Sequence, residues 1–251
     1  MKDYFKYIKN PIPLEKNERF TLNIYLKTIL LCLILSYSAS VFKMLLKIFD
    51  LLPEYRNPEV NSIILFFGVA AFLPLIEEIL LRLNLKISKL NIAVFFSVLA
   101  ALTIKLIFLR GIQVYIYLVS IPIFAPIYYI INRSNLSLHK IEIFWKSHFK
   151  YIFHFSAIAF GMLHLFNFET IKWWMIVISP LLIAPQIIVG YILGYIRMKH
   201  GFIYGWLIHS TINLFVVMLA IHKGIIVVLI LIIILIIINY FIKKMEKIIY
   251  S

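Results

Sequence analysis

The stretch Gly224–Ile242, with the sequence GIIVVLILIIILIIINYFI, decides the fold class. It carries no charged side chain, and nearly all of its positions are Ile, Leu or Val. Branched residues favour strands in water, but a run without alternation fits a lipid-facing helix better than a barrel strand. Because about 20 mainly apolar residues cross the hydrocarbon core as a helix, the stretch is predicted to span a membrane.

Similar apolar stretches recur along the whole chain. The predicted spans are residues 24–46, 61–83, 91–109, 112–132, 151–168, 173–196, 202–221 and 224–242. The chain is 63% hydrophobic and 14% charged, whereas a soluble domain is about 45–50% apolar and about 25% charged. The mean hydropathy of +0.97 agrees. A water-soluble globule is therefore excluded, and the predicted fold class is all-α, a polytopic membrane bundle of about eight transmembrane helices.

The 25 basic residues outnumber the 11 acidic ones and give a net charge of +14. They lie between apolar runs, which indicates contact with an anionic membrane surface rather than with nucleic acid. With a cytoplasmic N-terminus, seventeen basic residues fall in inner segments and seven in outer segments, and Lys27 lies inside the first span. The positive-inside rule therefore predicts that both termini are cytoplasmic. The single cysteine, Cys32, excludes an intramolecular disulfide.

The chain divides into one membrane domain and two short flanking segments. Residues 1–23 are predicted to be a polar cytoplasmic segment, residues 24–242 the transmembrane domain, and residues 243–251 a short basic tail. No small-residue cleavage site follows an early apolar core, so we expect no removable signal peptide. Residues 135–150 mix apolar side chains with Lys and His, which predicts an interfacial amphipathic stretch before the fifth span.

Two adjacent acids, Glu77 and Glu78, lie inside the second predicted span. A charge at the centre of a bilayer costs at least about 2.5–3.5 kcal/mol, so such residues suggest a functional site. Arg82 follows Glu78 by four residues and is predicted to neutralise it. Glu77 has no such partner and is left as a general base in a low-dielectric site. The alternative is that both acids are solvated charges at a helix end.

Three further polar side chains interrupt the later spans. His209 and Asn213 are four residues apart, so both can donate to one point, as in an oxyanion hole. The alternative is a hydrogen-bonded clamp between helices. His164 stands alone in an apolar segment, where an ordinary packing role is the alternative to a catalytic one.

These residues form three motifs in one order. They are Glu77-Glu78-x-x-x-Arg82, Phe160-x-x-x-His164 and His209-x-x-x-Asn213. Together they resemble the CPBP family of intramembrane proteases, also called the Abi or CAAX-protease and bacteriocin-processing family. That family includes the type II CAAX prenyl endopeptidase and lysostaphin resistance protein A. The resemblance covers residues 60–220.

The resemblance implies a role for each matching residue. Glu77 corresponds to the general base that activates water, and His164 to the histidine that holds the water. His209 and Asn213 correspond to the pair that stabilises the oxyanion. Glu78 and Arg82 correspond to a supporting ion pair, and Phe160 to a packing residue.

The chain also departs from the family pattern. Leu81 and Leu83 stand where bacterial members often have Phe and Gly. Glu77 and His164 are 87 residues apart, and this long separation contains residues 91–132, which are predicted to be an inserted helical hairpin.

These observations predict an intramembrane endopeptidase with a cavity open to the cytoplasm, in a bacterial cell membrane. The expected substrate is a membrane-associated peptide or protein, and no nucleic-acid partner is expected. A metal-free mechanism is favoured, and the alternative is a zinc ion bound by Glu77, His164 and His209. Two other functions stay open: a non-catalytic scaffold or bacteriocin-immunity protein, and a transporter with Glu77 as proton carrier. A transporter would be expected to show repeat symmetry, and the sequence has none.

Overall fold

The computed structural model describes residues 2–15, 17–49, 51–52, 67–108, 116–133, 138–170 and 172–220, and six positions between 233 and 244. Its long helices are α2 (Leu22–Ile48), α5 (Lys89–Phe108), α6 (Ile116–Arg133), α7 (Leu138–Leu163), α8 (Trp173–Lys199) and α9 (Phe202–Ala220). Shorter helical elements are α1 (Lys2–Lys9), η1 (Gly68–Phe72), α4 (Leu73–Leu81), η2 (Leu83–Leu85) and η3 (His164–Asn167). Every element in these ranges is helical, which confirms the predicted class. The predicted span 224–242 and the tail 243–251 lie almost wholly outside the described residues.

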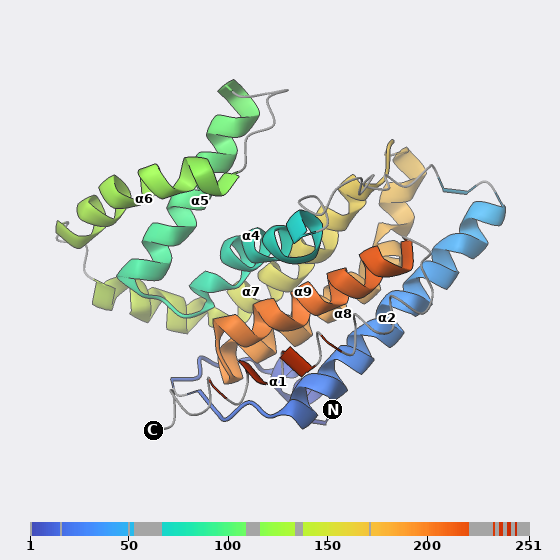
Figure 1. The fold of residues 1–251 in the computed structure, drawn as a ribbon, viewed down its shortest axis with the longest axis horizontal. Helices are drawn as coiled ribbons and strands as arrows, with labels where there is room; N and C mark the ends of the chain where they lie inside the picture. The colour runs from blue at the N-terminus through green and yellow to red at the C-terminus, as the bar shows by residue number, and fades with distance from the viewer. Residues whose placement is uncertain are drawn as a thin grey trace.

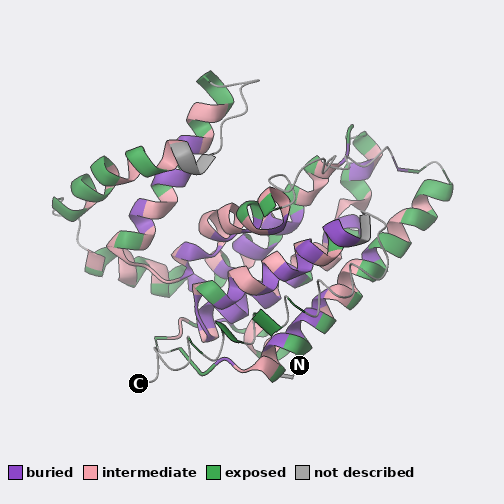
Figure 2. Ribbon diagram, in the orientation of Figure 1, coloured by how far each residue is buried: buried purple, intermediate pink, exposed green. Residues whose placement is uncertain are grey.

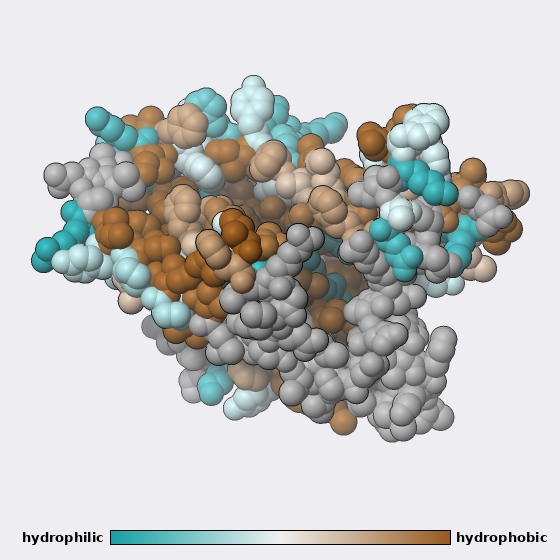
Figure 3. Space-filling view, turned by 90° about the horizontal axis from the view of Figure 1, so that it is seen from above, coloured by the Kyte–Doolittle hydropathy of each residue, from teal (hydrophilic) through white to brown (hydrophobic). Residues whose placement is uncertain are grey.

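Several of the described helices can cross a membrane. Four are long and apolar enough, namely α2, α5, the continuous segment Leu138–Asn167, and α8, and α9 contains a shorter apolar helix. Large apolar side chains point outward along α2: Leu30 is 61% exposed and Ile34 is 58% exposed. Hydrophobic side chains also cover most of the described surface in Figure 3, while hydrophilic ones lie mainly toward its edge. These features indicate a membrane protein, whereas the count of eight spans and the side of the termini remain predictions.

Helices α2, α4, α7, α8 and α9 pack into one bundle, and the α5–α6 hairpin projects from its side (Figure 1). Buried residues are concentrated in α8 and α9, while α6 is largely exposed (Figure 2). Glycines bring α7 and α8 close together. A Cβ on Gly190 would lie 3.0 Å from the carbonyl oxygen of Ala157, and one on Gly194 would lie 2.9 Å from the ring of Phe153.

Helix α7 begins thirteen residues before the predicted span at 151. The described part of the predicted interfacial stretch at 135–150 forms the first half of this helix and continues into the predicted span without a break. The physical reason is the absence of a helix breaker, since the sequence from Leu138 to Phe160 contains no Pro or Gly. The helix ends at Leu163, and η3 begins at His164.

The N-terminal segment folds against one end of the bundle. The ring of Tyr4 lies 4.6 Å from the ring of Tyr195 on α8. The backbone N–H of Glu18 donates to the carbonyl of Lys199 at 2.7 Å. A sharp turn at Gly201, with φ of 118°, separates α8 from α9 at this end. The described residues of this N-terminal segment are therefore a packed part of the bundle rather than a simple polar tail.

Candidate active site

The two adjacent acids lie on α4, directly after the π-helical turn η1. The N–H of Leu73 bonds to the carbonyl of Gly68, five residues back, instead of four. Pro74 has no N–H to offer the carbonyl of Ala70, and its ring disfavours a regular helix before it. The wide turn accommodates the proline and sets the direction in which α4 leaves it.

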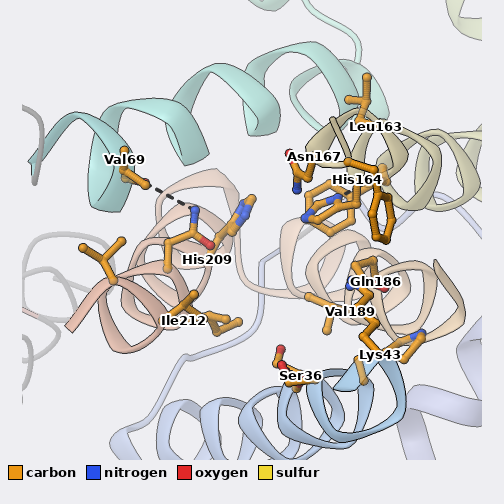
Figure 4. A pocket seen from close by; sticks show the side chains of 18 of the residues that line it. Ser36, Lys43, Val69, Leu163, His164, Asn167, Gln186, Val189, His209 and Ile212 are labelled. Carbon is orange, nitrogen blue, oxygen red and sulfur yellow. Dashed lines mark hydrogen bonds between the residues drawn. The ribbon is translucent and has the colours of Figure 1, made fainter. Parts of the chain in front are cut away.

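Side chains from α9 supply donors to the carbonyls of η1. Trp206 Nε1 donates to the carbonyl of Ala71 at 2.9 Å. Asn213 Nδ2 donates to the carbonyl of Val69 at 3.3 Å, as the dashed line in Figure 4 shows. Because buried carbonyls need donors, these bonds fix the start of α4 against α9.

The predicted pairing of Glu78 with Arg82 is present. Arg82 Nη1 lies 2.9 Å from Glu78 Oε1, and the side chains are 0% and 1% exposed, respectively. The Arg82 guanidinium also lies 4.1 Å from the centre of the Phe160 ring, a favourable cation–π distance. Glu78 is therefore a buried, neutralised group that cannot reach water.

A second arginine caps the end of α4. Arg197 on α8 donates through Nε to the carbonyl of Arg82 at 3.2 Å and through Nη2 to that of Leu83 at 2.9 Å. Ser156 Oγ donates to the carbonyl of Leu81 at 2.7 Å. The last carbonyls of a helix lack partners of their own, and a cation at that end is favourable. From the sequence, Arg197 is predicted only as one of the seventeen basic residues on the inner side, because no local pattern distinguishes a capping arginine.

His209 lies between the two carboxylates. Its Nδ1 is 3.0 Å from Glu78 Oε1, and its Nε2 is 3.4 Å from Glu77 Oε2. Glu78 is fully buried and ionised beside Arg82, so Nδ1–H donates to it. His209 therefore connects the buried pair of Glu78 and Arg82 to the carboxylate of Glu77, which lines the cavity.

His164 has a fixed tautomer. Its Nδ1 lies 2.9 Å from the carbonyl oxygen of Phe160, one turn earlier. A carbonyl only accepts hydrogen bonds, so Nδ1 carries the proton and Nε2 is left with a lone pair. The ring of Phe160 meets both histidine rings edge-on, with centroids 4.7 Å from His164 and 5.2 Å from His209. Phe160 thus positions both histidines and Arg82.

One cavity of about 560 Å³ brings these groups together. Its lining includes the predicted residues Glu77, Phe160, His164, His209 and Asn213. Glu78 and Arg82 lie outside the lining, as expected of a supporting pair. In Figure 4, His209 faces His164 across the cavity.

Sequence reasoning missed two polar side chains in the same lining, Asn167 and Gln186. Asn167 lies beside His164 in Figure 4. Its position three residues after His164 could have predicted this, because residues three apart in a helical segment are neighbours. Gln186 stands alone in the sequence of α8, and within the described chain its Oε1 has no hydrogen-bond partner.

The expected convergence of two donors is not present in this structure. Asn213 and His209 do share one face of α9 and one cavity, as their spacing predicted. The amide of Asn213 is directed to Val69, however, and the ring nitrogens of His209 are directed to the two glutamates. Buried carboxylates and carbonyls attract these donors more strongly than an empty cavity does.

The cavity lies in the half of the bundle away from the N-terminal segment. From α2 it takes residues 36–47, from the C-terminal half of that helix, and from α9 residues 209–217. Both helices begin at the end where the N-terminal segment packs. The lining of the cavity therefore lies toward the end of the bundle opposite the N-terminal segment.

The residues of the zinc alternative, Glu77, His164 and His209, all line this cavity. In the described part of the chain, no group of three or more His, Cys, Asp or Glu side chains is arranged to hold a metal ion. In this structure Nδ1 of His209 faces Glu78 and Nε2 faces Glu77, and the zinc alternative stays a prediction. Comparisons with protein families, with curated proteins and with solved structures found no match to this chain.

Proposed function

We propose that this chain is an intramembrane endopeptidase of the CPBP type, which hydrolyses a peptide bond in a membrane-associated peptide or protein of a bacterial cell membrane. One observation carries the proposal. Glu77, whose side chain is 20% exposed, and His164, from another helix, line one cavity, while the neighbouring acid Glu78 is buried and neutralised. A single basic carboxylate is thereby presented to a cavity that can hold water, with a hydrogen-bond acceptor, His164 Nε2, in the same lining.

The geometry suggests how water is activated. In this mechanism a water molecule donates one hydrogen to the carboxylate of Glu77 and the other to Nε2 of His164, since both groups are acceptors. Its lone pair is then free to attack a peptide carbonyl carbon. As the new C–O bond forms, Glu77 takes the proton of the water.

The remaining residues handle the charge that develops. The oxygen of the former carbonyl becomes an oxyanion, and Asn213 has a second N–H besides the one bonded to Val69. Because Glu77 has taken up the proton, its own negative charge no longer opposes the oxyanion. Glu77 then passes its proton to the leaving amine, and the C–N bond breaks.

The cavity walls suit a substrate from the membrane. Apolar side chains such as Met44, Leu73 and Val216 alternate with the polar groups of the lining. An extended peptide with apolar side chains could therefore enter without leaving buried polar groups unpaired.

The proposal is tested with purified protein and a panel of fluorogenic, lipidated peptides. Glu77→Gln is expected to lower kcat by about 10²–10⁴-fold, the usual contribution of a general base. Glu15→Gln is the matched control, because this exposed glutamate lies outside the cavity, and its activity should equal that of wild type. Asn213→Ala should also lose turnover.

A chelator arm separates the two chemistries. Turnover that is insensitive to chelator supports the glutamate mechanism, whereas inhibition by chelator that zinc reverses would support a zinc-dependent mechanism. If wild-type protein cleaves no peptide while wild type and Glu77→Gln bind a membrane partner equally, the scaffold or immunity function gains support.

A further inference from the structure

The structure gathers most of the described basic residues at one end of the bundle. Contacts between segments far apart in sequence define this end. Lys199 lies 3.2 Å from Glu18 and Lys146 lies 3.5 Å from Glu15. Lys86 Nζ donates to Asn17 at 2.7 Å. We call this region, with α1, Lys86, Arg197 and Lys199, the basic end.

The candidate site extends from near the basic end toward the opposite end. His209 lies seven residues into α9, about 10 Å along the helix axis from Phe202 at 1.5 Å per residue. Val217, which still lines the cavity, lies about 22 Å from the same point. Lys47 and Leu52 belong to the lining at the far end. The cavity therefore runs away from the basic end.

Membrane proteins retain Lys and Arg on the cytoplasmic side. By this rule we assign the basic end to the cytoplasmic side, the orientation predicted from the same excess of basic residues in the sequence. Only a few described basic side chains lie at the opposite end, Lys43, Lys47 and Lys172 among them. Two independent observations thus meet: the charge distribution orients the bundle, and the cavity lies in the half facing away from the cytoplasm.

We infer that the candidate site opens to the extracytoplasmic side of the membrane. One consequence rests on the proposed function: the substrates are membrane-anchored peptides whose scissile bond lies outside the cytoplasm. Peptides presented only from the cytoplasmic face would meet the packed N-terminal segment and the capped end of α4 instead of the cavity.

Single cysteines and a charged, membrane-impermeant maleimide test the inference in intact cells. The chain has one native cysteine, Cys32, which is fully buried, so wild type gives the background. Ser36→Cys places a thiol in the cavity and Lys47→Cys places one at its far end. Glu15→Cys reports the basic end, where this side chain is 82% exposed.

The expected result is labelling of Ser36→Cys and Lys47→Cys in intact cells, with Glu15→Cys at background until the membrane is permeabilised. The reverse pattern would overturn the inference, as would labelling of Lys47→Cys without Ser36→Cys, because the cavity would then be closed to water from outside. Labelling requires no turnover, so it is independent of the proposed chemistry.

A second arm tests the substrate side. Wild-type protein in right-side-out and inside-out vesicles receives the same fluorogenic acylated peptide, with Glu77→Gln as the inactive control. Cleavage in right-side-out vesicles alone is expected, and cleavage in inside-out vesicles alone would overturn the inference. The expected labelling with no cleavage in either vesicle would sustain the orientation and count against the peptidase.

Discussion

Replacing Arg82 with methionine should destabilise the protein strongly, because it leaves Glu78 buried without its cation. Arg82 Nη1 lies 2.9 Å from Glu78 Oε1, and the carboxylate is 1% exposed, so water cannot replace the lost contact. Removing one partner of such a pair costs about 3–5 kcal/mol. This corresponds to a roughly hundred- to several-thousand-fold shift in the unfolding equilibrium, since about 1.4 kcal/mol is tenfold.

The assay is denaturant-induced unfolding in detergent micelles, with a double-mutant cycle. Glu78→Gln combined with Arg82→Met removes both charges, so the double variant should be more stable than Arg82→Met alone. Lys146→Ala is the control, because its exposed pair with Glu15 should contribute less than about 1 kcal/mol. The reasoning fails if Arg82→Met lies within about 1 kcal/mol of wild type, or if the double variant is the less stable one.

Three further predictions concern packing and pH. Gly190→Ala should lower the free energy of unfolding by about 1–3 kcal/mol, because the new Cβ would press on the backbone of α7. Gly68→Ala should be neutral or stabilising, because its Cβ meets nothing within 4 Å. A thermal melt of both variants checks this pair. Tyr25→Phe loses the 2.7 Å bond to Thr211 that ties α2 to α9 and should lower the free energy of unfolding by about 1 kcal/mol in the same denaturant assay. Burial lowers the pKa of His200 below its ordinary value of 6.5. The unfolded chain therefore binds the proton more tightly, and the free energy of unfolding should fall as the pH drops below 6.5. His200→Gln should reduce this loss of stability between about pH 8 and pH 5, and an unchanged slope would show that His200 is not its source.

The helical fold class could be predicted from composition and run length, and the reason is general. A chain that is 63% hydrophobic must satisfy its backbone within each segment in lipid, and helices do this locally. Seven of the eight predicted spans coincide with a described helical element, though the element at 61–83 is described only from residue 67. Boundaries were less predictable. The start of helix α7 at Leu138 was missed because the prediction followed hydropathy. The first half of the helix has mixed polarity but no residue that breaks a helix.

At the candidate site, spacing alone predicted which neighbours on a helix meet. Glu78 and Arg82 pair because residues four apart share a face, and His209 and Asn213 line one cavity for the same reason. Contacts within one helix depend only on its period, so the sequence contains them. The roles assigned to these residues stay predictions until turnover is measured.

Contacts between helices were decided by the tertiary structure. The sequence by itself determined a helical membrane chain, its excess of basic residues and the spacing of its motifs. Only packing turned both nitrogens of His209 to glutamates, made Arg197 a cap for α4 and directed the cavity away from the basic end. Such features depend on how far each helix is rotated and shifted against its neighbours. That arrangement is set by many weak contacts and by the close approach at Gly190, none of which is local in the sequence.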